Sequence, residues 1–218
     1  MFDRDPWREF IAGARGKPPP SVMVLMATLA AGVLADSMFE LEPLVELFRL
    51  GSSAWREGQV WRVVTYGLVG SGPLSMWSVL QLVLVYWCVM EAVVLLGERA
   101  TRVLILGGIV AAGASALLAQ AFSDAIGGPT SAYPFWMMQG QSVVVALALP
   151  AFAARNRHST VMRTPLLFGL PIPSRWLVPL QILAALAAFT STRDFGGFVG
   201  IMTAIGWSMW FARPRSRW

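Results

Sequence analysis

The sequence has few charged residues for its length. Only 13% of its 218 residues are charged, while 56% are apolar and the mean hydropathy is +0.60. A soluble globular domain carries about 25% charged residues. The composition therefore excludes an ordinary soluble protein and predicts an integral membrane protein, whose length suits one compact bundle.

Cysteine, histidine and lysine each occur once, as Cys88, His158 and Lys17. A single cysteine excludes an internal disulfide and a cysteine-based metal cluster, and we expect neither a metal nor a cofactor. The net charge of +5 comes from basic residues dispersed among apolar stretches, without an aromatic-rich basic patch. This distribution argues against nucleic acid as a partner.

Long apolar stretches predict an all-α, polytopic membrane bundle. A helix needs about 20 apolar residues to cross a hydrocarbon layer about 30 Å thick. Six stretches are candidates, of which the first and fifth are short: Ser21 to Ala35, Pro73 to Leu96, Val103 to Phe122, Phe135 to Ala154, Trp176 to Thr190, and Phe195 to Ala212. The expected organisation is an N-terminal cytoplasmic segment (1–20), a six-helix membrane domain (21–212) and a basic cytoplasmic tail (213–218).

The positions of lysine and arginine predict that both termini are cytoplasmic. With the N-terminus inside, 13 of the 17 basic residues lie in cytoplasmic segments and four lie in outer loops, namely Arg49, Arg56, Arg62 and Arg193. Such an excess is typical of the cytoplasmic side. The first 20 residues mix acids with bases and end in prolines, so no cleaved signal peptide is expected. Sixteen arginines beside one lysine are associated with GC-rich bacterial genomes, and the bacterial inner membrane is the expected location.

The expected outer segment over 36–72 contains an amphipathic pattern. Its apolar residues recur at helical spacing opposite two glutamates, with Leu41, Leu44, Val45 and Phe48 on one face and Glu42 and Glu46 on the other. Two interpretations remain open. The segment is either a helix lying on the outer membrane surface or a loop helix packed on the bundle.

Small residues recur every fourth position in two of the spans. They are Gly196, Gly200, Ala204 and Ser208 in the last span, and Gly107, Ala111 and Ser115 in the third. Small residues at this spacing let helix backbones approach closely within a membrane. The pattern predicts helix packing rather than chemistry.

Five stretches, in order, resemble motifs of the rhomboid superfamily. They are GQVWRVVTYGLV, WCVMEAVVLLG, GQSVVVALALPAF, FGLPIPSRWL and DFGGFVGIMTAIG, within residues 58–206. The family has a Gly-X-X-Trp-Arg-X-X-Thr stretch before its second helix and a glutamate near that helix's end. It also has Gly-X-Ser-Gly at the start of its fourth helix and His-X-Gly-Gly-X-X-X-Gly at its sixth. The resemblance implies a six-helix fold that is either an intramembrane serine protease or a related pseudoprotease.

The resemblance places candidate catalytic residues on the fourth and sixth spans, with two departures from the family. Ser142, after Gly140, matches the catalytic serine, but Asp194 stands at the position of the catalytic histidine and Val143 replaces the second glycine. Pseudoproteases of this superfamily, such as derlins and inactive rhomboids, keep the fold and lose the Ser–His pair. The resemblance therefore implies that this chain is closer to them.

Residues that would support an oxyanion are also changed. The second-helix histidine and asparagine of the family would fall near Ser75 and Val79, and Gln81 is the nearest amide. We expect Gln81, together with Gln139, Gln141, Ser142 and Asp194, to line a polar cavity open to the outer face.

A serine nucleophile requires a base within hydrogen-bond reach. His158 lies sixteen residues beyond Ser142, or about 24 Å along a helix, and Lys17 is also expected on the cytoplasmic side. Asp194 is the remaining candidate, but a carboxyl with an ordinary pKa of about 3.9 is a weak base, which burial could strengthen. Asp194 is also expected to cap the last helix.

The other motif residues have structural interpretations. Glu91 is expected to form a buried hydrogen bond between helices. Trp61 and Arg62 are either an interfacial anchor or a contact for a client protein. We expect the motif glycines to set the geometry of the bundle, and they are Gly140, Gly196, Gly197 and Gly200.

Three functions remain open at the level of the sequence. The first is a non-catalytic rhomboid-like protein that binds transmembrane segments of other membrane proteins within the lipid. The second is an intramembrane serine endopeptidase using Ser142 with a non-standard partner, and the third is a small transporter. The absence of charged or broken helices at mid-membrane weighs against the transporter.

Overall fold

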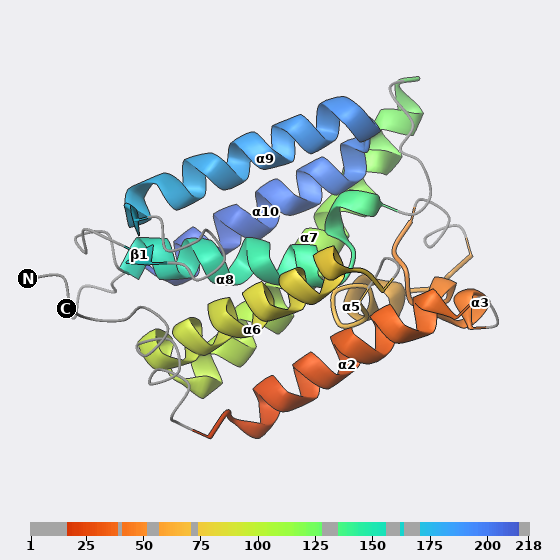
Figure 1. Cartoon of the computed structure of the whole chain (residues 1–218). Coiled ribbons are helices and arrows are strands. Elements are labelled where there is room, and N and C mark those ends of the chain that lie inside the picture. Colours follow the sequence, from red (N-terminus) through yellow and green to blue (C-terminus); the bar gives the residue numbers. More distant parts are fainter. Residues whose placement is uncertain are drawn as a thin grey trace, which may run out of the picture.

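A computed structural model describes residues 17–38, 41–51, 57–70, 74–127, 135–155, 162–163 and 171–213. Six helices of 15 or more residues lie in this part of the chain, and each matches one expected stretch (Figure 1). They are α2 (Pro20–Ser37), α6 (Met76–Leu96), α7 (Glu98–Ala125), α8 (Gln141–Arg155), α9 (Leu177–Thr192) and α10 (Phe195–Phe211). Residues 1–16, 71–73, His158 and 214–218, on which several predictions fall, lie outside the described residues.

Short elements connect the long helices. They are α3 (Glu42–Glu46), α5 (Arg62–Thr65), the 3₁₀ turns η1 (Trp136–Met138) and η3 (Ser174–Trp176), and the strands β1 (Met162–Arg163) and β2 (Pro171–Ile172). The two strands pair antiparallel, with Met162 opposite Ile172. The described chain is thus helical, as predicted, apart from this two-residue ladder.

Three helices are long and apolar enough to cross a membrane. These are α2, α6 and α7, while α8 and α10 are shorter apolar helices. By length and composition, the chain is a helical membrane protein.

Helix α8, the shortest of the six long helices, occupies the centre of the bundle. It contacts α6, α7, α9 and α10, and most of its side chains are buried. Its sequence is apolar on every side, with only two polar residues before Arg155. A helix without a polar face is stable when protein surrounds it. This central position fixes the start of α8, and with it Ser142, among the surrounding helices.

The most extensive helix contact joins α7 and α10. On α10, the predicted row of small residues is buried, and a side chain at Gly200 would meet the Ala112 carbonyl at 3.1 Å. On α7, the fully buried row lies one position beyond the predicted one. It consists of Gly108, Ala112 and Ala116, whereas Gly107, Ala111 and Ser115 are only partly buried.

The amphipathic helix expected in the first loop is much shorter than its pattern suggested. Helix α3 has five residues, and Val45 is buried while Leu44 is 54% exposed. The helix contacts α2. Val45 therefore packs on the bundle, as the loop-helix interpretation predicts. Leu41, Leu44 and Leu47 are exposed, so contact of this face with the membrane surface stays open.

The Trp-Arg motif explains why the chain turns after α3. The indole N–H of Trp61 donates to the Leu47 carbonyl at 3.1 Å, and the Thr65 hydroxyl donates to that of Phe48 at 3.3 Å. Arg62 Nη1 donates to the Arg49 carbonyl at 3.3 Å. Three side chains of one motif thus bind three consecutive carbonyls of the segment that follows α3, so these backbone acceptors are satisfied.

Candidate functional site

Ser142 is the second residue of α8 and lies on the wall of an open cavity of about 470 Å³. The cavity is bounded by α6, η1, α8, α9 and α10. Its lining includes Trp77, Gln81, Ser142, Gln181, Ala188 and Thr192. The serine is partly exposed, so its hydroxyl is accessible from this space.

An amide pair joins α6 and α8 beside the serine. Gln141 Nε2 donates to Gln81 Oε1 at 2.8 Å. Gln81 also lines the cavity, as predicted for the nearest amide on the second span. At the two positions that the resemblance assigned to a histidine and an asparagine, Ser75 caps α6 through the Ser78 N–H and Val79 is 46% exposed.

Asp194 is completely buried and caps α10, as expected for an acid at a helix N-terminus. Its Oδ1 accepts the Gly197 N–H at 2.8 Å, and its Oδ2 accepts the Met137 N–H at 3.2 Å. A Cβ on Gly197 would overlap this carboxylate, so glycine is required there. The motif glycine and the aspartate thus form one structural unit.

The side chains of Ser142 and Asp194 are not paired with each other in the described structure. No hydrogen bond joins their side chains there, while both carboxylate oxygens accept backbone N–H groups. A base must reach the nucleophile's proton by hydrogen bond or through one water molecule. The arrangement orients Asp194 toward the backbone of η1 and α10, and His158 lies outside the described residues.

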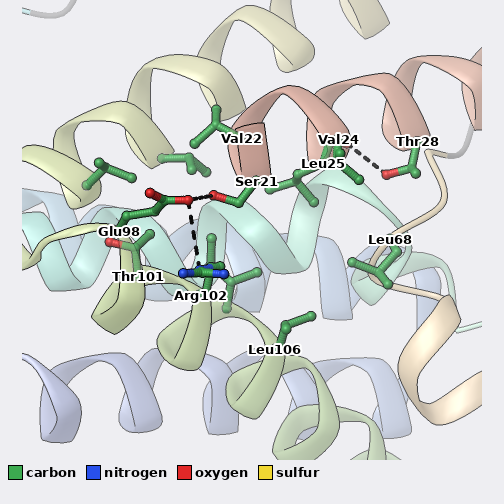
Figure 2. A pocket seen from close by; sticks show the side chains of 13 residues that line it. Ser21, Val22, Val24, Leu25, Thr28, Leu68, Glu98, Thr101, Arg102 and Leu106 are labelled. Carbon is green, nitrogen blue, oxygen red and sulfur yellow. Dashed lines mark hydrogen bonds and ion pairs between the residues drawn. The ribbon is translucent and has the colours of Figure 1, made fainter. Parts of the chain in front are cut away.

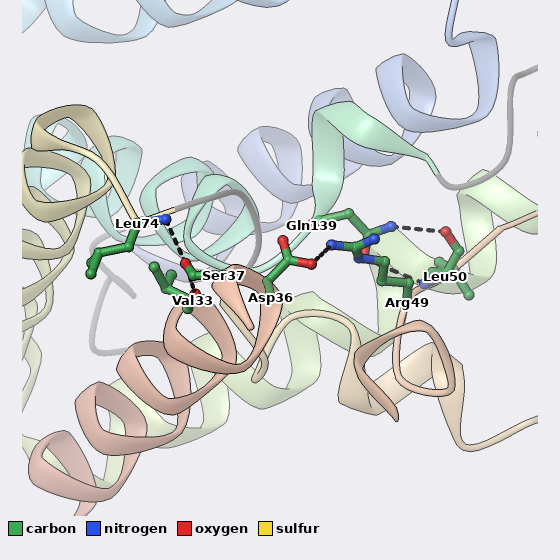
Figure 3. A network of polar contacts seen from close by, with 7 residues as sticks. All are labelled: Val33, Asp36, Ser37, Arg49, Leu50, Leu74 and Gln139. Carbon is green, nitrogen blue, oxygen red and sulfur yellow. Dashed lines mark hydrogen bonds and ion pairs between the residues drawn. The ribbon is translucent and has the colours of Figure 1, made fainter. Parts of the chain in front are cut away.

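Gln139, expected on the cavity, lies elsewhere. Its Nε2 donates to the Leu50 carbonyl at 2.8 Å and to the Phe135 carbonyl at 3.1 Å, and its Oε1 accepts the Leu50 N–H at 3.4 Å. Figure 3 shows this amide beside the ion pair between Arg49 and Asp36, whose side chains are each 7% exposed. Gln139 therefore ties the first loop to the segment before α8.

Gly140 adopts a left-handed backbone conformation, with φ of 52°. This conformation favours glycine and lets the chain turn from η1 into α8. The Gly140 N–H donates to the Tyr66 carbonyl at 2.8 Å, and the Tyr66 hydroxyl donates to the Ile109 carbonyl at 2.8 Å. Burial raises the pKa of Tyr66, which keeps the hydroxyl a donor. The first loop, α7 and the serine turn are thereby joined.

Val143 and Glu91 differ from their expected settings in distinct ways. Val143 is fully buried, so it fills the core beside Ser142 instead of exposing backbone to the cavity. Glu91 is half-buried in α6, but it makes no hydrogen bond within the described residues, contrary to the expected contact between helices.

Gln181 of α9 is a cavity residue that sequence reasoning missed. Its side-chain oxygen is buried and has no hydrogen-bond partner in the described structure. It lines the same cavity as Gln81 and Ser142. The signal was a single amide within the apolar run LVPLQILAALAAF, because a polar residue inside such a span usually lines a cavity or pairs with another.

No family model and no curated protein matches the chain. The rhomboid resemblance therefore depends on the motifs and their order alone.

Proposed function

We propose that the protein is a non-catalytic, rhomboid-like membrane protein that binds transmembrane segments of other membrane proteins in the cavity beside Ser142. The proposal depends on one observation: both oxygens of the Asp194 carboxylate accept backbone N–H groups. The residue that the resemblance places at the histidine position holds two segments together, and within the described residues the serine has no general base in hydrogen-bond contact.

The shape of the cavity supports a helical or unwound peptide as the occupant. Helices α6 and α9 make at most marginal contact with each other, and the cavity lies between them. The α9 side is built from small residues, Ala184, Ala185 and Ala188, while Gln81, Gln181 and Ser142 supply polar groups. Small residues admit close approach of a helix backbone, and amides can receive its exposed backbone groups.

The distribution of tryptophan supports six spans. Trp61 and Trp77 lie near one end of the bundle, and Trp176 and Trp210 lie near the other, and all four are more than 50% exposed. Exposed tryptophan at both ends is typical of the two membrane interfaces. Since the basic residues concentrate at the end with Trp176 and Trp210, this end is proposed to be cytoplasmic, in a bacterial inner membrane.

Site-specific photocrosslinking tests the proposal. A photoreactive amino acid at Ala188, on the cavity wall, is expected to capture membrane proteins through their transmembrane segments in intact membranes. The matched control is Leu118 of α7, which is 72% exposed and outside the cavity. Capture of the same proteins from both positions, or of lipid alone from Ala188, would overturn the proposal.

A second candidate function is intramembrane serine proteolysis, which the cavity position of Ser142 favours. It predicts covalent labelling by a fluorophosphonate or isocoumarin probe that is lost in Ser142→Ala. It also predicts that Asp194→Asn abolishes labelling while the protein remains folded. Without labelling of the folded wild-type protein, the non-catalytic function stands.

A further inference from the structure

A second cleft, of about 310 Å³, lies between α2, α6 and α7. It shares no lining residue with the cavity beside Ser142. Eight of its thirteen lining residues are aliphatic, including Val24 and Leu25 of α2, Val89 of α6, and Ile105 of α7. Its volume is near the lower limit of about 300 Å³ for small-molecule pockets, which suits part of an elongated apolar molecule.

Four of the five polar residues of this cleft, including both charged ones, gather at one end. Ser21, Glu98, Thr101 and Arg102 lie together where α2 and α7 begin, whereas Leu68 and Thr28 line the other end (Figure 2). Such a division, with one charged end and an apolar remainder, complements an amphiphile.

Arg102 has the donors to receive an anionic group. The Ser21 hydroxyl donates to Glu98 Oε1 at 2.7 Å, which satisfies part of that carboxylate. Arg102 meets the same oxygen only through Nε at 3.9 Å, and its side chain is 55% exposed. No hydrogen bond engages its terminal nitrogens within the described residues, and a guanidinium fork matches phosphate geometry.

The charges around the opening favour an anion. Arg99 follows Glu98 in α7, Lys17 lies four positions before Ser21, and both are exposed, so within the described residues basic groups outnumber acidic ones where α2 and α7 begin. We propose that the cleft binds an anionic phospholipid of the surrounding membrane, with one acyl chain among the aliphatic residues and the phosphate at Arg102.

Lipid labelling tests this site in the full-length protein. Nanodiscs would contain phosphatidylglycerol with a photoreactive group in its acyl chain, and crosslinked peptides would be mapped by mass spectrometry. The expected labels fall on α2 and α7 residues that line the cleft. Thr28→Trp, which fills the apolar end, is expected to reduce that labelling at least fivefold, as an occluded pocket loses its ligand.

A matched pair of variants tests the headgroup contact. Arg102→Gln is expected to lower the preference for phosphatidylglycerol over phosphatidylcholine about tenfold. Both headgroups carry a phosphate, but the choline cation of phosphatidylcholine offsets that charge, so the guanidinium charge favours phosphatidylglycerol. Arg99→Gln removes the adjacent exposed cation, which does not line the cleft, and should change the preference less than twofold. Thermal unfolding of each variant confirms that it is folded.

Any of three results would overturn the proposal. One is equal loss of preference in Arg99→Gln and Arg102→Gln, which would indicate attraction by surface charge alone. Another is wild-type labelling that falls outside the cleft. The third is labelling that inorganic phosphate suppresses as well as unlabelled phosphatidylglycerol does, since the acyl chain would then contribute nothing.

Discussion

The backbone N–H of Met137 donates to Oδ2 of Asp194 at 3.2 Å, although 57 positions separate the two residues. The other oxygen of this carboxylate accepts the Gly197 N–H at 2.8 Å. One buried side chain therefore holds the start of α10 against the turn that leads to Ser142. The position that the rhomboid resemblance matches to the catalytic histidine is thus a structural joint in this protein.

Replacing Asp194 is expected to destabilise the fold. Asp194→Ala removes the acceptor of two backbone N–H groups, one of them a helix cap, and should lower the free energy of unfolding by about 2–4 kcal/mol. Asp194→Asn should cost less, since its amide oxygen can still accept the Gly197 N–H. Denaturant or thermal unfolding of the purified protein in detergent measures both.

Ser191→Ala provides the control for this comparison. The Ser191 hydroxyl is exposed and bonds the Ala188 carbonyl of its own helix, so its loss should matter little. If Asp194→Ala were as stable as Ser191→Ala, the carboxylate would not be a structural joint.

Two serines on neighbouring helices should respond differently to alanine. The Ser142 hydroxyl makes no hydrogen bond in the described structure and faces an open cavity, so Ser142→Ala should change stability by less than about 0.5 kcal/mol. The buried Ser208 hydroxyl of α10 donates to the Leu147 carbonyl of α8, and Ser208→Ala should cost about 1–3 kcal/mol. Equal losses in the two variants would show that Ser142 has a structural partner.

The helices were predictable because each is a continuous apolar run, even though the first and fifth runs are short for a membrane span. The face of α7 that packs against its neighbours was not predictable. On α7, Gly107 and Gly108 are adjacent small residues, and Ala111 and Ala112 are as well. Two parallel rows of small residues satisfy the same spacing rule, and the sequence cannot choose between them. The structure buries the second row.

Part of the candidate site was predictable from where its polar residues stand relative to the apolar runs. The cap at Asp194 follows from its place before an apolar helix, and the Gln81–Gln141 pair follows from polar residues on adjacent spans. Gln139 was misplaced because the left-handed Gly140 separates it from α8. Helical periodicity therefore does not fix the direction of its side chain.

Glycines in the first loop and α10 give a test of close packing. A Cβ at Gly70 would overlap the Leu29 carbonyl of α2, whereas a Cβ at Gly206 would meet nothing within 4 Å. Gly70→Ala should therefore destabilise by about 1–3 kcal/mol, and Gly206→Ala should be neutral or stabilise by up to about 1 kcal/mol. Unfolding in detergent compares them, and a stable Gly70→Ala variant would show that α2 is free to move away from the loop.

The Asp36–Arg49 ion pair provides the sharpest test of how the first loop is held. Both side chains are 7% exposed, and they join the end of α2 to the segment beside Gln139 (Figure 3). Removing one partner leaves a buried charge, so Asp36→Asn or Arg49→Gln alone should cost about 3–5 kcal/mol. The double variant should cost clearly less than the sum of the two single losses, because neither charge then remains buried and unpaired.

Since burial also limits screening, the coupling energy between Asp36 and Arg49 should persist at high salt. The exposed Glu98–Arg102 pair, at 3.9 Å, is the control and should show a coupling below about 0.5 kcal/mol. Additive losses for Asp36 and Arg49 would mean that the loop is held by the carbonyl contacts of Trp61, Arg62 and Thr65 instead.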